Sequence, residues 1–268
     1  MISLIAAAAA AAIGILSYAA RARRRATQIR KPFPSEWREL LHHSLPLYRN
    51  MPAELRIRLE PFVREFLLDV DFVGCQGLIV TDEMRLVVTV QACLLIANNG
   101  AGAFRTLRSV LIYPDEFVVE ESDEDEAGVV TEGTRVLSGQ SFDTSRIVLS
   151  WRDVTEGGGT DEAYNVALHE FAHYLDHSVG LTERGHRALE GCHAVLKQEY
   201  EALCAAVDRG EPTLIDPYGA EHIEEFFAVA TETFFEQPRE LQLRHTHLYA
   251  ELQKFFGVDP ARWPLDAH

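Results

Sequence analysis

DEAYNVALHEFAHYLD, residues 161–176, contains no proline or glycine and follows a glycine run and Thr160, so it predicts a helix. Within it, His169 and His173 lie four residues apart, which places both imidazoles on one helix face, about one turn apart, where they can bind one metal ion. Glu170 lies beside them, where a carboxylate can reach a water on the metal without being a ligand. This HExxH pattern is typical of zinc peptidases, in which the metal lowers the pKa of the water and the glutamate accepts its proton.

The alternative is an amphipathic helix with two surface histidines, because a five-residue pattern also arises by chance. The motif has apolar neighbours that predict its burial, and burying two histidines and a glutamate without a metal would be costly. These neighbours are Val166, Ala167, Leu168, Phe171 and Ala172. We therefore predict a zinc hydrolase that binds one zinc ion per chain.

Zinc at a catalytic site needs a third protein ligand, with a fourth position left for water. The metzincin extension would require glycine and histidine where Asp176 and Val179 stand, so that subclass is excluded. In the predicted helix 220–236, four glutamates are candidate ligands: Glu221, Glu224, Glu225 and Glu232. Glu225 shares a helix face with the small residue Ala228, which lets a partner helix come close. Glu225 is therefore preferred, and Glu221 is the next candidate.

Other histidines are weaker candidates for ligands, because they fall on predicted surface positions of helices. They are His177, His186, His193 and His222.

Predicted strands come first along the chain and predicted helices dominate after residue 160, which indicates an α+β fold with a small mixed sheet packed against helices. The predicted strands cover residues 72–80, 109–121, 135–139 and 146–154, with residues 120–126 as an exposed acidic loop and residues 140–142 as a connection. The predicted helices cover residues 36–70, 81–99, 161–176, 184–208, 220–236 and 244–256, and Thr81 is a candidate N-cap.

Residues 2–20 carry no charge and precede an arginine cluster, Arg21 to Arg25. Their number is close to the roughly 20 residues that cross a bilayer. Because the positive charge follows the apolar run, we expect an inner-membrane anchor with the rest of the chain on the cytoplasmic side. An alanine-rich surface helix, a misassigned start and a secretory signal are the alternatives. Residues 1–35 are thus an apolar anchor with a basic linker, and residues 36–268 a zinc peptidase domain.

Charge and cysteine content narrow the partners and the compartment. The formal net charge is −16, and removing the six basic residues that precede Glu36 leaves −22 for the rest of the chain. This strong negative charge repels the phosphate backbone of DNA or RNA, so nucleic acid is excluded as a partner. The four cysteines contain no Cys-x-x-Cys pair, and we expect reduced, mostly buried thiols in a chain of 268 residues.

Several segments resemble the Mlc titration factor A family of zinc-dependent peptidases. They are SVLIYPDEFVV (109–119), SGQS (138–141), RIVLSW (146–151), NVALHEFAHYLD (165–176) and EEFFAVATETFFEQP (224–238). The resemblance implies a zincin-like core similar to the catalytic domain of anthrax lethal factor, with HExxH on a helix. It also implies a zinc ion held by the two motif histidines and by a downstream glutamate that matches Glu225.

The resemblance implies two further roles. Tyr218 matches a family tyrosine seven residues before the ligand glutamate, where a phenol can stabilise an oxyanion; the alternative is packing within its loop. Asp176 also matches the family and can orient a metal-binding histidine by accepting its hydrogen bond. An ordinary aspartate at a helix end is the alternative. The loop at residues 177–181 is shorter and less polar than in relatives, so the family's substrate preference does not carry over.

The family implies a cytoplasmic peptidase with aminopeptidase-like action on short peptides. It also implies an alternative, a regulatory protein that binds a transcriptional repressor of the Mlc type. A third interpretation, a structural zinc domain, is disfavoured because three ligands leave one position open. The presence of Glu170 favours the enzyme, since a binding protein needs no catalytic base.

Overall fold

The structure is a computed structural model that describes residue 19 and residues 23–98, 100–124, 130–137, 139–142, 145–157, 163–179 and 190–264. The predicted helical region 36–70 consists of three helices, α2 (Ser35–Ser44), α3 (Pro46–Asn50) and α4 (Ala53–Asp69). They are separated at Leu45 and Met51, which are extended. Leu45 precedes a proline, and the residue before a proline is disfavoured in helical geometry.

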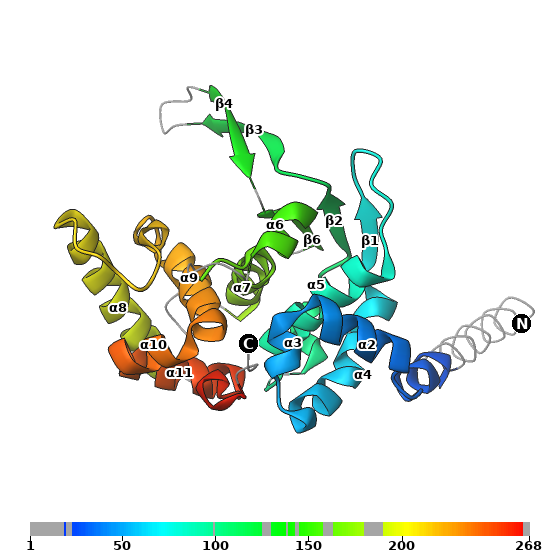
Figure 1. The fold of residues 1–268 in the computed structure, drawn as a ribbon. Helices are drawn as coiled ribbons and strands as arrows, with labels where there is room; N and C mark the ends of the chain where they lie inside the picture. The colour runs from blue at the N-terminus through cyan, green and yellow to red at the C-terminus, as the bar shows by residue number, and fades with distance from the viewer. Residues whose placement is uncertain are drawn as a thin grey trace, which may run out of the picture.

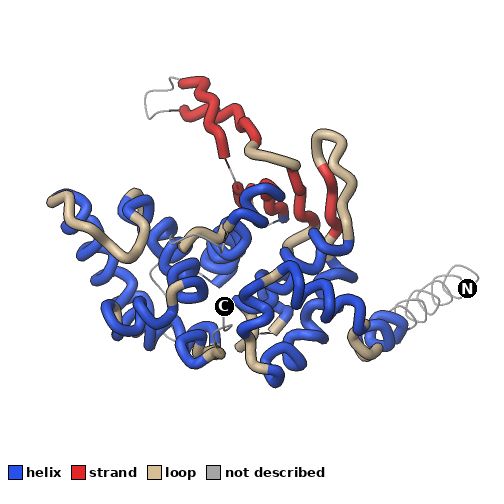
Figure 2. Tube along the Cα trace, in the orientation of Figure 1, coloured by secondary structure: helices blue, strands red, loops and turns tan. Residues whose placement is uncertain are grey.

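The main sheet has four strands in the order β1-β2-β6-β5. Figure 1 labels β1, β2 and β6, and Figure 2 shows the strands in red. Strands β1 (Asp71–Gly74), β2 (Ser109–Tyr113) and β6 (Arg146–Ser150) are parallel, and β5 (Gly139–Phe142) pairs antiparallel with β6. The predicted α+β class with a small mixed sheet is confirmed.

Three details of the predicted strands are wrong. The strand at 72–80 ends at Gly74, because Gln76 and Gly77 have φ angles of 51° and 82° and turn the chain out of the sheet. Residues 140–142 belong to β5, where pairing with β6 satisfies the backbone that was expected to be a connection. Residues 151–154 are helical, in α6 (Trp151–Glu156), because the Ser150 side chain accepts a hydrogen bond from the Asp153 backbone N–H at 3.3 Å and caps the helix.

The acidic segment differs as well. The predicted strand 109–121 is interrupted by a bend at Pro114 and Asp115, and a second strand, β3 (Phe117–Glu124), follows. It forms a two-stranded antiparallel sheet with β4 (Val130–Leu137), so residues 120–124 are strand and not loop. Acidic residues have a low intrinsic preference for strands, but this preference is weak, and hydrogen bonding to β4 continues the ladder through them.

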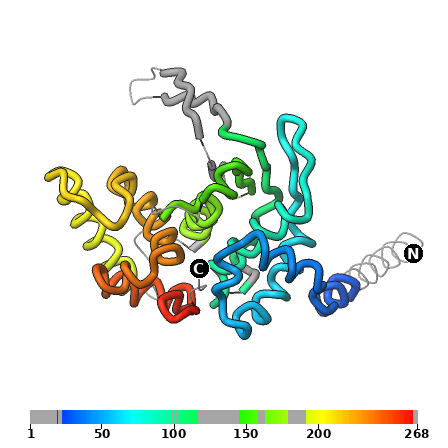
Figure 3. The backbone as a smooth tube through the Cα atoms, in the orientation of Figure 1, coloured from blue at the N-terminus to red at the C-terminus, as the bar shows by residue number. Residues whose placement is uncertain are grey.

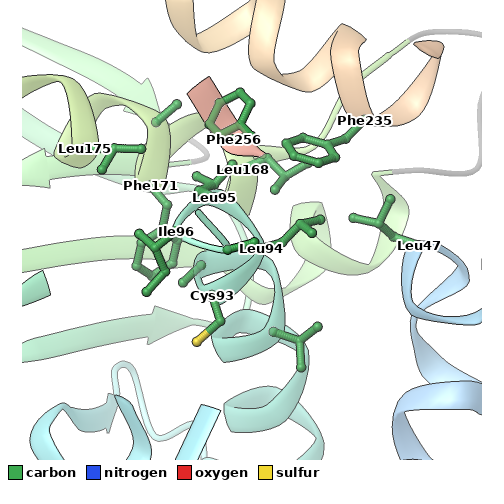
Figure 4. Close-up of a cluster of buried hydrophobic side chains, with 14 of the residues drawn as sticks. Leu47, Cys93, Leu94, Leu95, Ile96, Leu168, Phe171, Leu175, Phe235 and Phe256 are labelled. Carbon is green, nitrogen blue, oxygen red and sulfur yellow. The ribbon is translucent and has the colours of Figure 1, made fainter. Parts of the chain in front are cut away.

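Helix α5 (Asp82–Leu95) is the centre of the core. Its predicted cap is confirmed, because Thr81 Oγ1 accepts a hydrogen bond from the Met84 backbone N–H at 3.2 Å. All its residues from Leu86 to Leu95 are buried, so α5 is covered on every side. Figure 4 shows Leu94, Leu95 and Ile96 of this region beside side chains of the motif helix and of the C-terminal helices.

The second half of the described chain is helical. Its helices are α7 (Val166–Val179), α8 (Glu190–Asp208), α9 (Ile223–Glu236), α10 (Pro238–Arg244) and α11 (Thr246–Phe256), joined in part by the 3₁₀ turn η4 (Pro217–Ala220). Helix α7 lies between the N-terminal helices and the group α8–α11, and it packs against both α5 and α9 (Figures 1 and 3). The predicted helices 161–176, 184–208, 220–236 and 244–256 correspond to α7, α8, α9 and α11. Helix α10 was not predicted, and α7 continues to Val179 through residues that were expected to be loop.

All four cysteines are free, and Cys93 and Cys192 are buried. The predicted anchor, residues 2–20, lies outside the described residues apart from residue 19. Within the described parts of the chain, no helix combines the length and the apolar character that crossing a membrane requires.

Candidate metal centre

Three predicted ligands converge between α7 and α9. Their ligand atoms, from His169, His173 and Glu225, all lie within 4.8 Å of one another. The two Nε2 atoms are 3.1 Å apart, and each is 3.2 Å from Glu225 Oε2. The three side chains are 14–20% exposed, so the cluster is mostly enclosed but still reaches solvent.

Helix geometry and core packing produce this convergence. His169 and His173 lie one turn apart on α7, and their rings meet at an interplanar angle of 77°. Phe171 is fully buried and packs edge-on against Phe66 and Phe104, which anchors α7 in the core. Glu225 lies in the first turn of α9, which packs directly along α7.

Two other polar residues surround the cluster. Glu232 Oε1 lies 2.7 Å from His169 Nδ1, and Glu232 Oε2 accepts a hydrogen bond from the backbone N–H of Asn165. Asn165 precedes α7 and caps it, since its Oδ1 accepts a hydrogen bond from the Leu168 N–H at 3.1 Å. Glu232 was predicted only as a candidate ligand, and its contact with His169 was not predicted. The spacing of seven residues places Glu225 and Glu232 on one face of the helix, but it does not specify a contact with His169.

Burial and nearby charges shift the pKa values of three side chains at the site. Burial raises the pKa of Glu170 to about 7, although the two histidines oppose the rise. Burial lowers the pKa of His169, but hydrogen bonds to Glu225 and Glu232 outweigh it and raise that pKa to about 10. For Glu225, burial raises the pKa, and the hydrogen bonds to His169 and His173 more than reverse this, leaving it well below its usual range.

Tyr218 borders the cluster. It lies in η4, its ring centroid is 6.2 Å from that of His169, and it is 38% exposed. The Asp216 side chain accepts a hydrogen bond from the Tyr218 backbone N–H at 2.8 Å, which fixes the turn. Gly219 brings the turn close to α9, because a Cβ there would lie 2.6 Å from Val229 Cγ2.

The other candidates are not among the three clustered ligands. Asp176 is buried on α7, and the acceptor beside His169 Nδ1 is Glu232 rather than Asp176. Among the described residues, the remaining candidates do not join the three clustered ligands. They are Glu221, Glu224, Glu232, His177, His193 and His222; His186 lies outside the described residues.

Two imidazoles and one carboxylate within reach of one another are a donor set that zinc uses in hydrolases, with a fourth position left for water. A buried carboxylate with a raised pKa next to that set can accept and return a proton near neutral pH.

Comparison with known proteins agrees with this chemistry. Residues 19–257 match the family described as glucose-regulated metallo-peptidase M90. An uncharacterized protein of Synechocystis sp. is 36% identical over 237 residues, which cover 86% of each chain. Mlc titration factor A of Pectobacterium atrosepticum is 33% identical over 81% of this chain and 84% of its own. Mlc titration factor A of Yersinia enterocolitica is 31% identical over 88% of this chain and 90% of its own.

These relatives confirm the resemblance to Mlc titration factor A that the sequence motifs indicated. Since the family match spans most of the chain and includes both α7 and α9, it covers every residue of the clustered site. The family's description implies that its members bind a metal ion. The chain belongs to the glucose-regulated metallo-peptidase M90 family.

Proposed function

We propose that the chain is a zinc-dependent peptidase in which His169, His173 and Glu225 hold one zinc ion. The observation that carries the proposal is the convergence of these three ligand atoms within 4.8 Å of one another, beside a buried glutamate. When bound, zinc would act as a Lewis acid, polarising the peptide carbonyl and lowering the pKa of a water to about 7.

Glu170 is the proposed general base. It follows His169 directly on α7, is 6% exposed, and has a pKa raised by burial to about 7. A carboxylate with such a pKa can take a proton from the attacking water and deliver it to the departing amine. Tyr218 is the proposed donor to the oxyanion, because its half-exposed phenol borders the His169 ring.

The family and the site support a more specific assignment. We assign a zincin-like core with HExxH on α7 and an aminopeptidase-like action on short peptides. Asp176, buried one turn after Ala172 on α7, remains proposed as an acceptor that orients a metal-binding histidine. Residues 36–268 are proposed as the zinc peptidase domain.

A regulatory function is the second candidate, because two of the relatives are named for titration of Mlc. In that case the chain binds a transcriptional repressor, and peptide hydrolysis is secondary. Such binding does not require a catalytic base, so it would survive the replacement of Glu170.

Zinc content and turnover together test the proposal. The full-length chain is expected to hold about one zinc ion, and His169→Ala and His173→Ala to lose it. Glu170→Gln is expected to keep the zinc but to lose turnover of unblocked short peptides by about 10²-fold or more. Equal zinc content in the wild type and both histidine variants would refute the ligand assignment. Equal turnover of the wild type and Glu170→Gln would favour the regulatory function.

N-terminally acetylated peptides test the aminopeptidase assignment separately. An aminopeptidase requires the free α-amino group, so the acetylated forms are expected to be poor substrates. Cleavage of blocked and unblocked peptides at the same rate would instead indicate an endopeptidase.

A further inference from the structure

Glu232 contacts His169 at the ring nitrogen opposite to the one that faces Glu225. Its Oε1 lies 2.7 Å from His169 Nδ1, while Glu225 Oε2 lies 3.2 Å from His169 Nε2. The two glutamates are seven residues apart on α9, and they therefore meet the two nitrogens of one imidazole from the same helix face. The Glu232 side chain is only 3% exposed, so solvent does not compete for its oxygens.

The second oxygen of Glu232 is also occupied. Glu232 Oε2 accepts a hydrogen bond from the backbone N–H of Asn165, the residue that caps α7. One carboxylate thus holds the start of α7 and, four residues later, the ring of His169. The Asn165 amide donates to Glu236 Oε1 at 2.8 Å, which ties the same cap to the end of α9.

We infer that Glu232 is a positioning residue that holds the His169 ring in place and keeps its proton on Nδ1, so that Nε2 presents its lone pair to the metal. This inference rests on the proposed zinc site. An ionised carboxylate only accepts hydrogen bonds, so a bond between Oε1 and Nδ1 requires the proton on Nδ1. A buried carboxyl group that accepts a hydrogen bond from this nitrogen also makes the opposite nitrogen a stronger ligand.

Glu232→Gln tests the inference, because an amide has one accepting and one donating end. It cannot accept from both the His169 Nδ1–H and the Asn165 N–H, and it carries no charge. We expect the full-length variant to fold and to bind zinc about 10- to 100-fold more weakly than the wild type. The affinity is measured by competition with a chromophoric zinc chelator at fixed pH, a readout that does not involve turnover.

Glu236→Gln is the matched control. It lies four residues further on α9 and also contacts Asn165, but a glutamine Oε1 still accepts from the Asn165 amide. Its zinc affinity is expected to equal that of the wild type. Equal weakening in both variants would show that loss of a negative charge from this end of α9, rather than the contact with His169, affects the metal, and would overturn the inference.

A second measurement needs no variant. In the zinc-loaded wild type with ¹⁵N-labelled histidine, NMR should show a proton on His169 Nδ1 and none on Nε2. Either an unprotonated Nδ1 or a Glu232→Gln affinity equal to that of the wild type overturns the inference. If the wild type itself binds no zinc, the proposed function fails, and the two failures are therefore distinguishable.

Discussion

The charges around His169 make metal binding a competition with a proton. Without a metal, hydrogen bonds to Glu225 and Glu232 overcome the effect of burial and raise the pKa of His169 to about 10. The ring is then protonated at neutral pH, and it must release a proton before Nε2 can bind zinc. We expect zinc affinity to rise about tenfold per pH unit near neutrality and to level off above about pH 10. Chelator competition at several pH values measures the slope, and an affinity independent of pH would contradict this charge balance.

Tyr218 allows a second test at the scale of single residues. An oxyanion donor acts mainly in the transition state, so Tyr218→Phe is expected to lower kcat by about 10²-fold with a smaller change in KM. Its zinc content should match that of the wild type, because the phenol is not among the three clustered ligands. An effect on KM alone would identify Tyr218 as a residue that binds substrate.

Site residues within the one motif on α7 could be predicted from the sequence, whereas those on α9 could be predicted only in part. His169, Glu170 and His173 share one short motif, so the period of one helix was enough to group them. Glu225 required a choice among four glutamates, which the spacing to Ala228 and the family resemblance supported. The contact of Glu232 with His169 depends on how α7 and α9 pack, and no local pattern specifies that distance.

At the scale of elements, the packing of η4 on α9 holds Tyr218 beside the metal centre. Gly219 permits this approach, because a Cβ at that position would lie 2.6 Å from Val229 Cγ2 and 3.2 Å from Leu203 Cδ2. Gly219→Ala is therefore expected to displace the turn and to lower the free energy of unfolding by about 1–3 kcal/mol. It should also lower kcat, as Tyr218→Phe does, because the displaced turn carries Tyr218. Urea unfolding and steady-state kinetics measure the two effects.

Gly191→Ala is the control for that substitution. Its added Cβ would meet only Glu251 Oε2, at 4.0 Å, so the extra methyl group enters open space on α8. We expect stability equal to or slightly above that of the wild type, since alanine is the better helix former. If Gly219→Ala is as stable and as active as Gly191→Ala, then η4 accommodates the added methyl group and the prediction is wrong.

The elements themselves were predictable where local signals dominate. Helix α5 has a cap, acidic residues in its first turn and a long apolar run, and its start at Asp82 follows from Thr81. In contrast, β5 exists because β6 offers it hydrogen bonds, and residues 120–124 are strand because β4 lies beside them. Pairing with another strand cannot be inferred from a segment's own composition, even where that strand follows within a few residues, which is why both were misassigned.

At the scale of the whole molecule, the basic N-terminal segment contacts an acidic body. Arg25 pairs with Glu65 and Asp69 on α4, and all three side chains are 30–45% exposed. Exposed ion pairs of this kind contribute about 0–1 kcal/mol each, so they do not hold the body together. The metal centre draws all three clustered ligands from α7 and α9, far along the chain from this segment.

Removal of residues 1–30 therefore tests both the domain boundary and the predicted anchor. The truncated chain keeps the Arg64 hydrogen bond to the Pro32 carbonyl, and the side-chain ion pairs that it loses within the described residues are the exposed pairs of Arg25. We expect it to bind one zinc ion and to retain full activity per zinc, whereas the full-length chain fractionates with membranes and resists extraction by salt. Full-length chain in the soluble fraction would show that residues 2–20 do not insert. The arginines that follow the apolar run predict that the body faces the cytoplasm. If protease added to intact spheroplasts digests the body, the body instead lies outside the membrane and the predicted topology is wrong.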